Sequence, residues 1–152
     1  ERVVAIKLME NKFVPCVAPK YLKEYGVPSC TSDLKHHKGL FFKTPMGETP
    51  WLSEIQGQWQ DVSGHPVLVS NSGKWLVKKA IEGLGILMLP QWVVQSNLER
   101  GELVKLQFDQ PLDITQSGHF GIYMLYQKTA YNLPKIKAMV DFIAGKVKSQ
   151  SK

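Results

Sequence analysis

The segment SNSGKWLVKKAIEGLGILMLP (residues 70–90) predicts how the fold is organised. It follows the apolar run PVLVS and opens with small polar residues of the types that cap helices. Apolar residues then recur at helical spacing: Val77, Ala80, Ile81 and Leu84. Gly83 and Gly85 end this predicted helix, and ILML is a short run typical of a buried strand. A strand, a helix and a strand joined by such short connections favour a parallel or mixed sheet that is covered by helices.

The same alternation continues on both sides of this segment. Further strands are predicted at residues 2–8, 13–18, 51–55, 66–70, 103–108 and 119–128. Further helices are predicted at residues 19–26, 91–100 and 133–147, with a short helical turn at 32–37 that Ser32 and Asp33 cap. Residues 56–65, QGQWQDVSGH, are expected to form a hairpin connection or a loop. The C-terminal helix has the clearest apolar stripe: Leu133, Ile136, Val140, Ile143 and Val147.

The chain is basic, but its charges are dispersed. Nineteen Lys and Arg against thirteen Asp and Glu give a net charge of +6 and an isoelectric point near 9.3. The longest basic cluster is only Lys78–Lys79, which is typical of a solvated surface; nucleic-acid binding and recognition of an acidic ligand or partner stay open as alternatives. Apolar residues make up 43% of the chain, but the sequence contains no run of the roughly 18 apolar residues that a membrane span needs. The sequence therefore predicts a soluble globular protein.

No catalytic or metal-binding pattern stands out in the sequence. Cys16 and Cys30 lack the Cys-x-x-Cys spacing of redox and zinc sites, so reduced structural thiols are expected. No carboxylate stands at metal-ligand spacing from any of the four histidines: His36, His37, His65 and His119. The sequence has neither a G-x-S-x-G motif nor a dinucleotide-binding glycine motif. We therefore expect no catalytic residue, no metal ion and no cofactor.

The start of the helix within residues 70–90 is the strongest candidate for a binding site. The candidate residues are Ser70, Asn71, Ser72 and Gly73. They would present hydroxyl, amide and backbone N–H groups at the positive end of the helix dipole, where a carboxylate or similar anion binds favourably. Simple capping of the helix is the competing interpretation. Trp59, in a polar loop, is a candidate for lining a cleft, whereas core packing is expected of the other tryptophans: Trp51, Trp75 and Trp92.

Taken in order along the chain, several segments resemble the effector-binding domain of LysR-type transcriptional regulators. The resemblance rests on VAPKYL (17–22), GVP (26–28), DLKHH (33–37), VSNSGKW (69–75), AIEGLGILMLP (80–90), LERGELVKL (98–106) and LPKIKAMVDFI (133–143). Each segment alone is unspecific, but in this order they extend over nearly the whole chain.

The resemblance implies an α/β fold like that of type II periplasmic binding proteins, in which two lobes enclose a small-molecule site. Residues 11–104 would form a complete effector-binding lobe II, and residues 1–10 and 105–152 would supply part of lobe I with the crossover strands. The rest of lobe I, and the winged helix-turn-helix that binds DNA in this family, are expected outside these 152 residues.

The resemblance also implies the function of a bacterial sensor in the cytoplasm, without enzyme activity or membrane association. A small-molecule effector, for which the basic charge favours an anion, would bind between the lobes and change how a homodimer or homotetramer holds promoter DNA. The residues expected to contact the effector are Ser70, Asn71, Ser72, Gly73 and Trp59. A periplasmic solute-binding protein of the same architecture is the alternative, which an export signal would distinguish.

Overall fold

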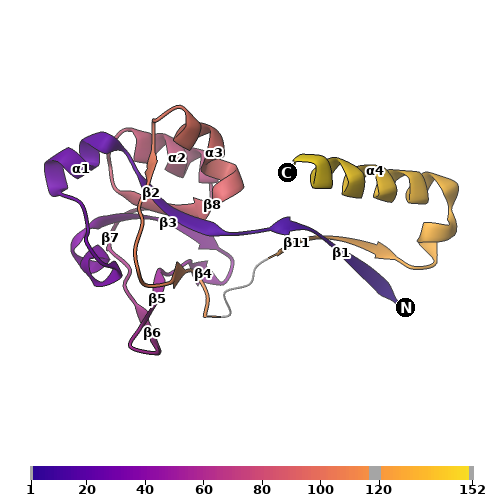
Figure 1. Ribbon diagram of the computed structural model, residues 1–152, viewed down its shortest axis with the longest axis horizontal. Helices are drawn as coiled ribbons and strands as arrows, with labels where there is room; N and C mark the ends of the chain where they lie inside the picture. The colour runs from indigo at the N-terminus through magenta and orange to yellow at the C-terminus, as the bar shows by residue number, and fades with distance from the viewer. Residues whose placement is uncertain (1, 117–120, 151–152) are drawn as a thin grey trace. The chain divides into compact units, whose positions relative to one another are not determined.

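The computed structural model describes residues 2–116 and 121–150, and within them the chain forms two compact units (Figure 1). The larger unit runs from β2 (Phe13–Val17) to β10 (Leu112–Asp113). The smaller unit combines β1 (Val3–Glu10) with β11 (Gly121–Gln127) and the helices that follow it. Each unit has a sheet of its own.

Among the described residues, the larger unit is built on a mixed sheet of six strands. These strands are β2, β3 (Lys38–Thr44), β4 (Gly47–Glu48), β7 (His65–Ser70), β8 (Ile86–Pro90) and β9 (Val104–Lys105). β3 pairs in parallel with both β7 and β8, whereas β2 runs antiparallel to β8 and β9. The chain passes from β7 to β8 through the predicted helix, α2 (Gly73–Ile81). The strand–helix–strand prediction is therefore confirmed.

Helices cover both faces of this sheet. α2 and α3 (Gln91–Glu99) pack on one face, against strand residues that include Val14, Cys16, Leu40, Leu87 and Leu89. α1 (Pro19–Tyr25) and the short 3₁₀ helix η1 (Thr31–His36) pack on the other face, against residues that include Val17, Phe41, Ile86 and Met88. Neighbouring residues of one strand enter opposite cores because side chains alternate along a strand. This layered arrangement confirms the predicted α/β class.

The hairpin of β5 (Leu52–Ile55) and β6 (Gln58–Asp61) corrects the connection expected at residues 56–65. Only Gln56 and Gly57 form the turn, and their φ angles are 51° and 75°. Two-residue turns with positive φ at both positions match the twist of the flanking strands, so pairing resumes directly after the turn. β10 pairs with the other side of β5 and completes a small three-stranded sheet.

The tryptophans differ from their predicted environments in three of four cases. Trp59 lies on β6 and is half-buried, so the expected polar loop around it is wrong. Trp51 is buried as predicted, and its ring stacks on Phe41 with 4.8 Å between the centroids. Trp75 and Trp92 were expected in the core but are 41% and 54% exposed. Each stands in the first turn of its helix, on the side away from the residues that pack on the sheet.

The capping of the short helix η1 agrees with the prediction for Asp33 but not for Ser32. Cys30 occupies its N-cap position, and Ser32 is exposed. Asp33 reaches back toward the residues before the helix, where its carboxylate accepts hydrogen bonds from the Ser29 hydroxyl at 2.7 Å and the Ser29 N–H at 3.0 Å. These bonds lower the pKa of the Asp33 carboxyl group. Of the two predicted capping residues, Asp33 therefore acts as expected, from the third position of the helix, whereas Ser32 does not.

The smaller unit consists of the antiparallel pair β1–β11, the 3₁₀ turn η2 (Ala130–Asn132) and α4 (Pro134–Gln150). α4 packs against β1. Four positions of the predicted stripe are buried or half-buried as expected: Ile136, Val140, Ile143 and Val147. Leu133 is not, because it ends η2 before α4 begins and is 58% exposed. The predicted strand residues His119 and Phe120 lie outside the described residues.

Candidate functional site

The candidate site lies where β3 and β7 end. The two strands are parallel, and Phe42, two residues before the end of β3, is paired with Ser70, the last residue of β7. Because the carboxyl ends of parallel strands meet at one edge of a sheet, the segments that follow them lie together. They line an open pocket of about 550 Å³. Its lining residues are Lys43, Thr44 and Pro45 from the end of β3, and Val69, Ser70 and Asn71 from the end of β7.

The predicted residues divide between lining this pocket and building the helix start beside it. Ser70 and Asn71 line the pocket. Ser72 is the N-cap of α2, and its hydroxyl accepts the Trp75 N–H at 3.2 Å. Ser70 also supports this turn, since its hydroxyl accepts the Ser72 N–H at 3.1 Å. The capping interpretation therefore holds for Ser72, and the pocket lining consists of the two residues before it.

Gly73 and Trp59 stand differently toward the pocket. Gly73 is the first residue of α2, and the first amides of an α-helix have no acceptor within the helix. Its backbone N–H therefore belongs to the positive end of the helix dipole. Trp59 faces Glu54 across the β5–β6 hairpin and is absent from the described lining of the pocket. The structure brings Ser70 and Asn71 together with β3, but not Trp59.

The wall formed by β3 was not anticipated from the sequence. Thr44 fixes its turn, because its hydroxyl donates to the Gly47 carbonyl at 2.9 Å and accepts the Met46 N–H at 3.2 Å. Lys43, just before it, is exposed and carries the positive charge of this wall. The signal in the sequence was the position of Lys43 and Thr44 directly after the apolar run Leu40–Phe42, just as Asn71 follows an apolar run.

The charged groups in the described lining of the pocket are positive, although Glu48 is paired with Lys43 across the antiparallel strands β3 and β4. Lys43 contributes a full charge, and the N-terminus of α2 contributes a partial one. The described residues that line the pocket include no carboxylate. Such a combination of lysine, hydroxyl, amide and helix start suits a small anion, and the dipole contributes about 0.3–1 kcal/mol when exposed.

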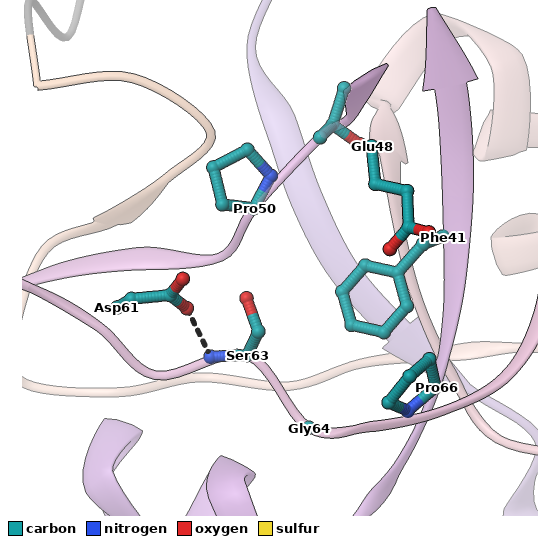
Figure 2. A pocket seen from close by; sticks show the side chains of 8 residues that line it. Phe41, Glu48, Pro50, Asp61, Ser63, Gly64 and Pro66 are labelled. Carbon is teal, nitrogen blue, oxygen red and sulfur yellow. Dashed lines mark hydrogen bonds between the residues drawn. The ribbon is translucent and has the colours of Figure 1, made fainter.

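A second pocket, of about 290 Å³, has the opposite character (Figure 2). Figure 2 shows Glu48 and Phe41 on one side and Asp61 and Ser63 on the other. The Asp61 carboxylate accepts the Ser63 N–H at 2.9 Å, and the Ser63 hydroxyl accepts the Trp51 N–H at the same distance. Both polar side chains thus hold the loop after β6 in place, and we assign this pocket a structural role.

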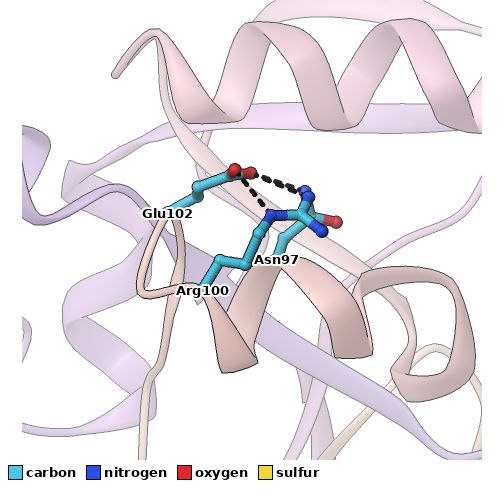
Figure 3. A network of polar contacts seen from close by, with 3 residues as sticks. All are labelled: Asn97, Arg100 and Glu102. Carbon is cyan, nitrogen blue, oxygen red and sulfur yellow. Dashed lines mark hydrogen bonds and ion pairs between the residues drawn. The ribbon is translucent and has the colours of Figure 1, made fainter.

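A polar network at the end of α3 closes that helix (Figure 3). The Glu102 carboxylate accepts hydrogen bonds from Arg100 Nε at 2.8 Å and from Asn97 Nδ2 at 2.9 Å. The Arg100 bond is the main reason that the pKa of Glu102 is lowered, and the Asn97 bond adds to it. The Asn97 carbonyl also accepts the Glu102 N–H at 3.0 Å. These contacts fix the turn after α3.

Three other kinds of feature were sought in the part of the chain that the structure describes: a metal site, a disulfide and a membrane-spanning helix. No group of three or more His, Cys, Asp or Glu side chains there could hold a metal ion. Cys16 is fully buried, and burial raises the pKa of its thiol to about 12. Cys16 and Cys30 are both free thiols. None of the described helices is long and apolar enough to cross a membrane.

Comparison with known proteins finds one family. Residues 1–148 match the model of the LysR substrate binding domain. The chain is 34% identical over 147 residues to the HTH-type transcriptional activator TtdR of Escherichia coli, which covers 93% of this chain and 44% of that protein. Its fold is similar to that of full-length AphB, a virulence activator of Vibrio cholerae, with 26% identity, a TM-score of 0.77 and coverage of 95% of this chain and 50% of that one. CrgA, a LysR-type transcriptional regulator of Neisseria meningitidis, has a similar fold, with 23% identity and a TM-score of 0.79. The match covers 95% of this chain and 48% of the CrgA chain.

Proposed function

The chain belongs to the family of LysR substrate-binding domains, and from this premise we propose that it is the sensor of a bacterial transcription regulator. It has the α/β, periplasmic-binding-protein-like fold of that family. TtdR and CrgA are named transcriptional regulators, which favours a regulator over the periplasmic solute-binding alternative. The chain spans less than half the length of TtdR.

The effector of this sensor is proposed to bind in the pocket at the ends of β3 and β7. One observation carries the proposal: two segments far apart in the sequence, 43–45 and 69–71, meet there in a pocket of about 550 Å³. This volume lies within the range of about 300–1,000 Å³ that small-molecule sites occupy. Ligands of open α/β sheets bind outside the carboxyl ends of the strands, which is where this pocket lies.

The chemical class proposed for the effector is a small anion, such as an organic acid. Lys43 supports this class through its charge, and Asn71 and Ser70 through hydrogen bonds to carboxylate oxygens. Ser72 and Gly73 contribute the start of α2, whose backbone N–H groups favour negative charge. Trp59 lies on β6 and does not belong to the described lining of the pocket. It therefore stays a candidate contact that the geometry of this pocket does not support.

The regulatory mechanism proposed is a population shift. The larger unit, which corresponds to the expected lobe of residues 11–104 extended as far as β10, would act as the effector-binding lobe, and the smaller unit as part of the other lobe. An effector that prefers one arrangement of the lobes would change how a homodimer or homotetramer in the cytoplasm holds promoter DNA through a winged helix-turn-helix. The size of the response is limited by the effector's differential affinity for the two arrangements.

The proposal is tested by thermal unfolding of the purified protein with a panel of small mono- and dicarboxylates, inorganic phosphate, and neutral amide analogues of the acids. A ligand that binds the folded state raises the midpoint of unfolding, and the stabilisation grows with the logarithm of one plus the ratio of its concentration to Kd. We expect at least one acid to do so and its amide to fail. Lys43→Met should weaken binding of this acid. Lys105→Met, which changes an exposed lysine on β9, should not.

Two results would contradict the proposal. In the first, an acid stabilises the Lys43→Met and Asn71→Ala proteins as strongly as it stabilises the parent protein. Such an acid must bind elsewhere, and the pocket is then not the effector site. In the second, a neutral analogue stabilises the protein as strongly as the acid does. This result would contradict the proposal that the effector is an anion, but not the proposal that it binds in this pocket.

A further inference from the structure

The hydroxyl group of Tyr21 joins three elements of the larger unit. It lies 3.0 Å from Nδ1 of His37, the residue that follows η1, and the Lys38 N–H at the start of β3 donates to it, also at 3.0 Å. Tyr21 itself belongs to α1 and is only 1% exposed. Its ring is part of the core with Leu34 and Trp51. The start of β3, η1 and α1 therefore share one buried oxygen atom.

The donors and acceptors at this oxygen determine which form of His37 fits. A backbone N–H can only donate, so the Tyr21 oxygen accepts from Lys38 and has its own hydrogen left to donate. Nδ1 of His37 can accept that hydrogen only when the imidazole is neutral and carries its proton on Nε2. Protonation places a hydrogen on Nδ1, where it faces the Tyr21 hydroxyl. The hydroxyl hydrogen then loses its acceptor in a buried position, which is unfavourable.

The surroundings of His37 favour the neutral form. The titratable and charged groups around the pair are Tyr21, Glu24 and Tyr25 on α1, Asp33 and His36 on η1, Lys38 on β3 and His65 on β7. Burial is the main cause that lowers the pKa of His37; Asp33 opposes this effect and His36 adds to it. The Lys38 ammonium is engaged by the Tyr25 hydroxyl at 2.7 Å. The His65 N–H donates to the His37 carbonyl at 2.7 Å, which holds the backbone of His37 beside β7.

We propose that the Tyr21–His37 pair is a pH-sensitive latch, which holds α1 and the end of η1 against β3 at neutral pH and releases this corner in mildly acidic solution. The latch is at Lys38, the first residue of β3, whereas the effector pocket is at Thr44, its last residue. Acidity is therefore a second input to the domain, separate from the effector, and this inference does not depend on effector binding.

The test measures amide hydrogen exchange at Lys38, together with NMR titration of the His37 ring, at about pH 7.5 and about pH 5, on either side of the ordinary histidine pKa. After correction for intrinsic exchange, protection of the Lys38 amide should fall several-fold at the lower pH. His37→Asn keeps an acceptor near the position of Nδ1 but does not titrate, so its protection should change little. His36→Asn, at an exposed neighbouring position, leaves His37 titratable, so Lys38 protection in this variant should still fall at the lower pH.

The proposal is overturned if Lys38 protection is the same at both pH values, or if His37→Asn loses protection as the parent protein does. An NMR spectrum showing that the neutral His37 ring carries its proton on Nδ1 would also overturn the proposal, because Tyr21 could not then donate to that atom. Tyr21→Phe provides a second arm: it should lower Lys38 protection at neutral pH and abolish its pH dependence. Persistent pH dependence in this variant would assign the effect to another group.

Discussion

Phe42 on β3 is paired with Ser70, the last residue of β7, across the parallel strands, and β3 continues for two more residues, which pair with β4. Lys43 follows one residue and Asn71 follows the other, and both line the candidate effector pocket. The register of one pair of strands thus brings together a cation and an amide that lie 28 positions apart in the sequence. A shift of this register by one residue would point every side chain of β7 to the opposite face.

Asn71→Ala should weaken binding of the effector without unfolding the domain. Asn71 is exposed and lines the pocket, so its removal costs hydrogen bonds to the ligand and no core contact. We expect affinity to fall about fivefold to tenfold, the equivalent of one hydrogen bond of about 1 kcal/mol. Isothermal titration with the acid found by thermal unfolding measures the change, and Asn132→Ala, on the exposed η2 turn, is the matched control. Equal affinity for the parent and Asn71→Ala proteins would remove this residue from the site.

Ser72→Ala should destabilise the larger unit through loss of a helix cap. The Ser72 hydroxyl accepts the Trp75 N–H, which otherwise has no partner within α2. The free energy of unfolding should fall by about 1 kcal/mol, as measured by urea denaturation. Ser32→Ala is the comparison, since Ser32 is exposed and the structure assigns the capping of η1 to Asp33. If the two alanine variants lose the same stability, the cap on α2 is not what stabilises the helix start.

Gly64→Ala should be far more harmful than Gly73→Ala. A Cβ atom at Gly64 would lie 2.5 Å from the His37 carbonyl oxygen and 2.9 Å from that of Leu34, and both are backbone atoms that cannot rotate away. We expect a loss of about 1–3 kcal/mol in the free energy of unfolding. At Gly73 the nearest atom would be a Leu89 methyl group at 3.9 Å, an ordinary contact, so the change should stay within about 0.5 kcal/mol. Chemical denaturation of both variants makes the comparison, and similar losses would show that the backbone around His37 can yield.

Glu102→Gln should remove a pH-dependent contribution to stability. The pKa of Glu102 is lowered, first by Arg100 and then by Asn97, so its carboxylate stabilises the fold above its unfolded pKa of about 4.3. This contribution is lost as the pH falls through the lowered folded pKa. The difference between the parent and variant midpoints should therefore be constant above about pH 5 and shrink toward about pH 3. Glu24→Gln, an exposed carboxylate on α1, serves as control. A difference that does not change over this range would contradict the linkage.

Only one of the two thiols should react in the native protein. Cys16 is fully buried and its pKa is about 12, so the reactive thiolate is scarce and inaccessible. Cys30 is partly exposed at the start of η1. A chromogenic thiol reagent at about pH 8 should label one site per folded chain and two after denaturation. In Cys30→Ser the native protein should remain unlabelled, and rapid labelling of that variant would mean that the core around Cys16 opens readily.

The sequence alone determined the order and type of many elements, but it did not predict β3, the strand at Lys38–Thr44. Residues 70–90 predicted a helix between two strands of the sheet, and α2 and β8 lie there, because apolar spacing and capping residues act within a few positions of the chain. The ends of α1 and α3 were also predicted from local signals, Gly26 and Gly101. Both glycines adopt the positive φ that is common just after a helix. The same local patterns identified Ser70 and Asn71 as candidates, together with the helix start that they precede.

Only the tertiary structure decided what surrounds these residues. Lys43 and Thr44 join the pocket through the parallel register of β3 and β7, and Tyr21 meets His37 through the packing of α1 on β3; no pattern within one segment encodes either meeting. Trp75 and Trp92 face solvent for the same reason, since the identity of a side chain does not say which side of a helix will meet the sheet. Short-range propensities specify elements, whereas pairing between distant strands and burial of their faces decide which side chains share a site.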